Sequence, residues 1–132
     1  MPPLTDAVRG DCATRGIAIA APLEYGQARQ LLDKVGYAAH EWSEVPITYR
    51  DADGGVPIAV VRRVLEHELG WEYHDLSTTQ PTFEIDRLPM GSVVVMLASN
   101  GHLCAVVDWV LYDTYDSREG GQATIAGYWT PP

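Results

Sequence analysis

Residues 101–113 read GHLCAVVDWVLYD, and this stretch decides how the C-terminal half of the chain folds. Two apolar runs, 103–107 and 110–114, flank the dipeptide Asp108-Trp109. This spacing is typical of two strands that are joined by a two-residue turn. The stretch therefore predicts an antiparallel β-hairpin.

The register of this hairpin selects an acidic partner for His102. With a two-residue turn, counting outward along the strands places His102 opposite Tyr115, and side chains alternate between the two faces. Asp113 then lies on the same face as a diagonal cross-strand neighbour, within reach of a hydrogen bond. Asp116 points to the other face and would take over the role only if the turn slipped by one residue.

Helical patterns precede the strands. The predicted helices span 12–20 after Asp11 as N-cap, 23–35 between Pro22 and Gly36, and 57–69 before Gly70. In the first helix, Ile17, Ile19 and several alanines are expected in the core. Further strands are predicted at 71–74, 83–85, 93–98 and 125–129, and a polar loop at 116–122. Helices first and an antiparallel sheet second predict one α+β domain over 1–132.

Composition limits the function classes. Nine Lys+Arg against eighteen Asp+Glu give a formal charge of −9, which disfavours nucleic-acid binding, and 46% hydrophobic residues argue against general disorder. The sequence shows no membrane-spanning run and no signal peptide. Two cysteines cannot form a disulfide framework, so a reducing cytoplasm is expected.

Cys12 is the candidate nucleophile. A thiol in the first turn of a helix faces the positive end of the helix dipole, which favours the thiolate. An imidazole such as that of His102 can pair with the thiolate and later protonate a leaving group. A third polar group, here Asp113, must then hold the imidazole in its productive tautomer.

Other uses of these residues are weaker. Cys104 shares a face with His102, so a regulatory Cys12–Cys104 disulfide or a zinc site of Cys12, Cys104 and His102 is conceivable. The paired spacing that is typical of zinc sites is missing, and neither a metal nor another cofactor is expected. Trp109 at the hairpin tip is difficult to bury and is predicted to line a cleft or a partner surface.

The chain also resembles a known superfamily. Asp11-Cys12 at the start of a small-residue helix, followed far downstream by Gly101-His102, an apolar strand, a short turn and a strand ending in Asp113, resembles the papain-like cysteine peptidases. The likeness is closest to their compact bacteriocin-processing branch. The stretches YDTYD at 112–116 and GYW at 127–129 are similar to small phage and prophage proteins of this layout.

The resemblance implies a papain-like fold, in which the nucleophile helix and further helices pack on a C-terminal antiparallel sheet. It implies that Cys12 is the nucleophile, His102 the acid and base, and Asp113 the orienting partner. Members often carry a Gln six residues before the Cys that donates to the oxyanion. Here that position is Asp6, which as a carboxylate cannot donate.

Asp6, Asp11 and Asp116 are the further residues expected around the oxyanion or behind the triad. The expected activity is hydrolysis of a peptide, isopeptide or small amide bond through a thioester. Two alternatives stand beside it: a phage-type binding or inhibitor protein on the same fold, and a transglutaminase-like acyl transferase. The expected partners are a protein or peptide substrate or a host protein target. The chain is expected to be a monomer or a small homo-oligomer. It is expected in the cytoplasm, which is the cytoplasm of the host if a phage encodes the chain.

Overall fold

The computed structural model describes residues 7–8, 10–98, 101–113 and 123–132. Four helices pack against a five-stranded antiparallel sheet, which confirms the predicted α+β class. The helices are α1 (Cys12–Ala20), α2 (Tyr25–Tyr37), α3 (Ala39–Trp42) and α4 (Ile58–Arg62), and a π-helical turn over Arg63–Glu68 continues α4. Within the described residues, no helix combines the length and the apolar character needed to cross a membrane.

The main sheet has the strand order β3-β7-β4-β5-β6. Its strands are β3 (Glu72–Asp75), β4 (Ser92–Leu97), β5 (Leu103–Val107), β6 (Val110–Tyr112) and β7 (Ile125–Thr130). A second, two-stranded sheet pairs β1 (Ala7–Val8) with β2 (Val56–Pro57).

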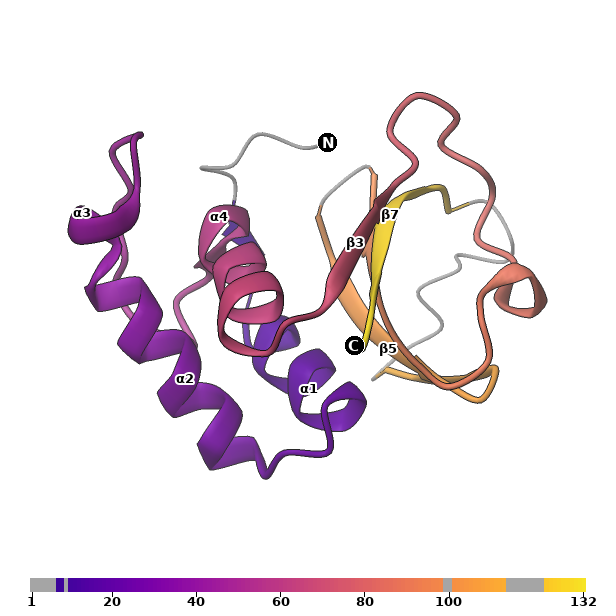
Figure 1. Cartoon of the computed structure of the whole chain (residues 1–132), viewed down its shortest axis with the longest axis horizontal. Helices are drawn as coiled ribbons and strands as arrows, with labels where there is room; N and C mark the ends of the chain where they lie inside the picture. Colours follow the sequence, from indigo (N-terminus) through magenta and orange to yellow (C-terminus); the bar gives the residue numbers. More distant parts are fainter. Residues whose placement is uncertain (1–6, 9, 99–100, 114–122) are drawn as a thin grey trace.

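The helices cover one face of the main sheet (Figure 1). Alternation along β5 separates two cores. Leu103 and Ala105 join the core that the helices close, whereas Cys104 and Val106 join a second core on the other face. Phe83 and other side chains from the segment before β4 close this second core.

The β5–β6 hairpin has the predicted register. Val107 pairs with Val110, so Asp108 and Trp109 form the two-residue turn, with φ angles of 49° and 65°. Side-chain contacts hold this left-handed turn: Trp109 Nε1 donates to the Leu88 carbonyl at 2.8 Å, and Asp108 Oδ1 accepts from a backbone N–H at 3.1 Å.

The first helix has the predicted bounds, with two corrections. Asp11 makes no side-chain cap, because its carboxylate instead pairs with Arg15 one turn later. Ile17 is fully buried as predicted, but Ile19 is 40% exposed because it lies on the rim of a cavity rather than in the core.

Other elements shift or change type. The second helix begins at Tyr25 rather than 23, since the N–H of Glu24 bonds Gln27 Oε1 at 2.9 Å and fixes the first turn there. Residues 83–85 form no strand. Phe83 lies in a loop and its side chain is buried, and a 3₁₀ turn follows at Ile85–Arg87. The predicted loop at 116–122 lies outside the described residues.

Candidate functional site

Cys12, the first residue of α1, opens onto a cavity of about 330 Å³ between this helix and the β5–β6 hairpin. The helix lies close over β5, because an added Cβ at Gly16 would be 3.8 Å from the backbone of Cys104. The cavity is lined by Cys12, Arg15, Gly16, Ile19, Leu103, Cys104, Leu111, Tyr112 and Asp113. Mainly apolar walls therefore surround a thiol, a guanidinium and a carboxylate.

His102 and Asp113 are in direct contact. Gly101, with φ of 67°, lets the chain turn into β5, and the His102 carbonyl accepts from the N–H of Leu97 at 2.9 Å. His102 Nε2 then lies 2.6 Å from Asp113 Oδ2, and the two side chains are 8% and 5% exposed. The predicted diagonal pairing of His102 with Asp113 is confirmed as geometry.

Asp113 links this pair to the cavity at Cys12, because it bonds His102 and also lines that cavity. His102 itself is not among the described residues that line that cavity. Asp6 and Asp116 lie outside the described residues.

The cation in contact with the sulfur is Arg15, which sequence reasoning missed. Its Nη2 lies 3.6 Å from Cys12 Sγ. Its Nε lies 3.0 Å from Asp11 Oδ1, although the N–H is not directed at that oxygen, so the contact is an ion pair rather than a hydrogen bond. Tyr25 holds the other oxygen of Asp11, its hydroxyl donating at 3.0 Å. The Cys12–Arg15 spacing of three residues, one turn of a helix, was the available signal.

Burial raises the pKa of the Cys12 thiol above its ordinary value. The Arg15 guanidinium acts in the opposite direction, by its charge and its hydrogen bond, while the carboxylates of Asp113 and Asp11 raise the pKa further. The thiolate expected from the helix dipole is therefore not the favoured resting form, because desolvation opposes it.

Cys104 is buried and Cys12 is half-buried. They line the same cavity, but Cys104 belongs to the core on the sheet face that the helices do not cover. Among the described residues, no three His, Cys, Asp or Glu side chains are grouped closely enough to hold a metal ion.

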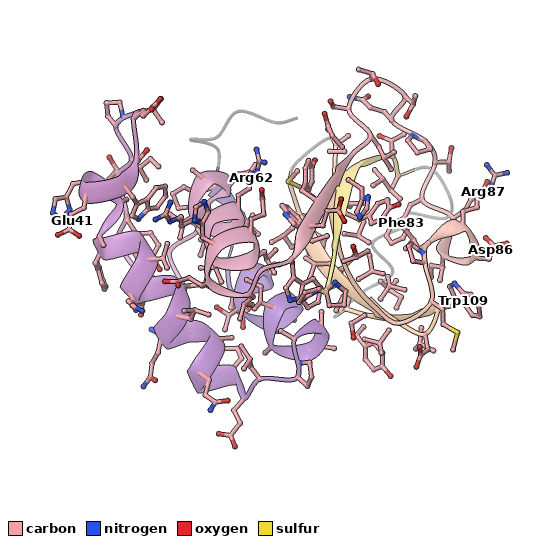
Figure 2. The ribbon with its side chains drawn as sticks, in the orientation of Figure 1. Glu41, Arg62, Phe83, Asp86, Arg87 and Trp109 are labelled. Atoms are coloured by element: carbon pink, nitrogen blue, oxygen red, sulfur yellow. The ribbon has the colours of Figure 1, made fainter. Side chains whose placement is uncertain are left out.

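The hairpin end carries a second feature. Trp109 is 48% exposed, and Figure 2 shows it at the end of the sheet that lies far from the helices. Val110, Tyr112 and Met90 are also exposed hydrophobic residues, and Tyr112 lines the Cys12 cavity as well. Exposed apolar side chains thus occur at the hairpin tip and along β6, and one of them, Tyr112, also lines the cavity.

Comparison of the chain with family models, with curated proteins and with solved structures gave no match.

Proposed function

We propose that the chain is a papain-like, cysteine-dependent hydrolase of amide or related acyl bonds. The observation that carries the proposal is the buried contact of 2.6 Å between His102 Nε2 and Asp113 Oδ2. Asp113 also lines the cavity at Cys12. A thiol at a helix start, an imidazole and a carboxylate that orients it are the groups that thiol-based acyl chemistry requires.

In the proposed reaction, Cys12 Sγ attacks the substrate carbonyl carbon and its proton passes to His102. Since Asp113 engages Nε2, the proton travels through Nδ1. The tetrahedral intermediate collapses, the C–N bond breaks, and His102 returns the proton to the departing amine. Water then attacks the thioester while His102 takes its proton. The C–S bond breaks, His102 returns the proton to Sγ, and the carboxylic acid leaves the regenerated Cys12 thiol.

The raised pKa of Cys12 fits such a concerted proton transfer. A thiol that is protonated at rest needs a base at the moment of attack, and His102 is the base that the proposal names. The mainly apolar walls of the cavity favour a substrate with an apolar group next to the scissile bond, and a peptide or protein in the cytoplasm supplies such groups.

Acylation by p-nitrophenyl acetate tests the proposal. The readout is the mass of the intact protein, with peptide mapping to locate the acetyl group. We expect acetylation of Cys12 and its loss by hydrolysis on further incubation. His102→Ala should slow acylation by about 10²–10⁴-fold, the range of general acid–base catalysis. Asp113→Asn should slow it as well, because the amide no longer supports the imidazole in the same tautomer.

Two variants complete this experiment. Cys104→Ser should acylate like wild type, and Cys12→Ala should not acylate at the site. Equal acylation rates for wild type and His102→Ala would contradict the triad. Glycine methyl ester in the reaction separates the related acyl-transfer activity from hydrolysis, since transfer yields an amide in place of the free acid.

A binding protein is the second candidate function, favoured by the exposed apolar surface of Met90, Trp109, Val110 and Tyr112. Such a surface is typical of a contact site for another macromolecule. Under this alternative, Cys12 would be acetylated only at the rate of an ordinary thiol, and His102→Ala would not slow that reaction.

A further inference from the structure

We propose that Arg15 supplies the oxyanion donor of this site, and that Asp11 and Tyr25 position it. The inference rests on the proposed function, because an oxyanion forms only if Cys12 attacks a carbonyl group. It identifies a catalytic residue that fills the role left open where Asp6 replaces a donor.

The position of Arg15 on α1 follows from helix geometry. Residues three apart lie on one face of a helix, so the Arg15 side chain extends over the turn that bears Cys12. Nη2 approaches Sγ to 3.6 Å, and both residues line the same cavity. An oxyanion forms on the oxygen of the carbon that bonds to Sγ, so a donor in contact with Sγ is well placed to reach it.

The Asp11 carboxylate and the Cys12 sulfur both contact the Nε–Nη2 edge of the Arg15 guanidinium. Asp11 holds the Nε edge by charge at 3.0 Å, and Tyr25 from α2 donates to the second oxygen of Asp11 at 3.0 Å. A guanidinium offers five N–H donors in a rigid plane, so a carboxylate that holds Nε also sets where the donors of the neighbouring Nη2 point. The two contacts to Asp11 thereby fix the direction in which Nη2 points.

The Arg15 donor lines a mainly apolar cavity and is partly open to solvent. The Arg15 side chain is 30% exposed, and the Asp11 carboxylate that pairs with it is 38% exposed. A fixed cation at a developing negative charge stabilises the transition state without reorganisation at the moment of reaction.

Two chemical probes separate this role from an effect on the thiol alone. Iodoacetamide alkylates a thiolate by displacement and forms no oxyanion, whereas p-nitrophenyl acetate forms one. Both rates at Cys12 are measured by peptide mapping for wild type and Arg15→Gln at the same pH. We expect acylation to fall by about 10²–10³-fold, the usual effect of losing one oxyanion donor, and alkylation to fall much less.

The control and the conservative variants sharpen the test. Arg87→Gln removes a surface arginine that pairs with Glu84 away from the cavity, and both rates should match wild type. Arg15→Lys keeps the charge without the planar fork and should recover only part of the acylation rate. Tyr25→Phe releases Asp11 and should lower acylation several-fold, with the KM for the ester nearly unchanged.

Equal reductions in acylation and alkylation by Arg15→Gln would overturn the inference, since Arg15 would then act on the thiol alone. Acylation at the wild-type rate in Arg15→Gln would overturn it as well, while the proposed hydrolase would stand. If wild type itself acquires no acetyl group on Cys12, the proposed function fails and this inference fails with it.

Discussion

At the scale of single residues, Arg15 and Asp113 set opposing electrostatic effects on Cys12. The guanidinium lowers the pKa of the thiol and the carboxylate raises it, with burial the largest cause of the net increase. Asp113 nevertheless supports the proposed chemistry, because it holds the imidazole that removes the thiol proton. The same carboxylate thus disfavours the resting thiolate and, in the proposed reaction, assists its formation when a substrate is attacked.

Tyr49 provides a pH prediction at this scale. Burial raises its pKa well above the ordinary value of about 10, and its hydroxyl donates to Asp33 Oδ1 at 2.7 Å. Above that ordinary value, the unfolded chain loses the phenolic proton while the folded chain keeps it. Unfolding then releases protons, so the free energy of unfolding falls as the pH rises.

Urea unfolding at about pH 8 and about pH 11 measures this effect. Tyr49→Phe should be less stable than wild type at the lower pH, since it lacks the hydroxyl that bonds Asp33, but should lose less stability on going to the higher pH. Tyr73, whose pKa is raised to about 12, leaves a residual pH dependence in the variant. Equal losses in wild type and Tyr49→Phe would contradict the assignment.

At the scale of elements, the β5–β6 hairpin and α1 could be predicted because their signals are local. The register around Asp108-Trp109 is enough to bring His102 to Asp113, since strand alternation propagates from the turn. The burial of Phe83 without a strand was not predictable, because the second core that covers it is built from segments distant in sequence.

Gly101 lies directly before His102, next to the start of β5, so its backbone conformation affects where the His102 side chain is placed. Its φ of 67° is strained for any residue with a side chain, and an added Cβ would lie 3.3 Å from Ile58 Cδ1. Gly101→Ala should destabilise the fold by about 1–2 kcal/mol through the left-handed backbone alone. It should also slow acylation of Cys12, because the strain falls on the residue before His102.

Gly70→Ala is the matched control for this prediction. Gly70 has a φ of 73° with open space where a Cβ would be added, and it follows the π-helical turn away from the Cys12 cavity. Thermal unfolding should show a similar loss of stability in both variants, and acylation should change in Gly101→Ala alone. A Gly101→Ala chain that acylates like wild type would show that the backbone before His102 does not control its position.

At the scale of the whole molecule, Glu66 ties the helical layer to the sheet. Trp129, fully buried on β7, donates its Nε1–H to Glu66 at 3.1 Å, and Arg62 donates to both carboxylate oxygens at 2.7 and 3.1 Å. Figure 2 shows Arg62 on the α4 side of β3. Glu66 and Trp129 are 63 residues apart, so no local pattern in the sequence could have predicted this contact.

Glu66→Ala should lower the free energy of unfolding by about 1–3 kcal/mol, because it leaves the buried Trp129 N–H without its acceptor. Glu66→Gln keeps an acceptor oxygen and should cost less. Glu68→Ala removes a partner of Lys34 in an exposed pair and should change stability by no more than about 1 kcal/mol. Urea unfolding of the three variants tests this order, and an equal effect of Glu66→Ala and Glu68→Ala would contradict it.

The place of β7 in the sheet also affects how the chain folds as it leaves the ribosome. β7 is the last strand in sequence, yet it lies between β3 and β4 (Figure 1). Until residues 125–130 emerge, both neighbours present unpaired backbone edges, which are prone to pair with other chains. The helices and the hairpin with His102 precede β7 in the chain, but the sheet that they pack against closes only when β7 inserts between β3 and β4.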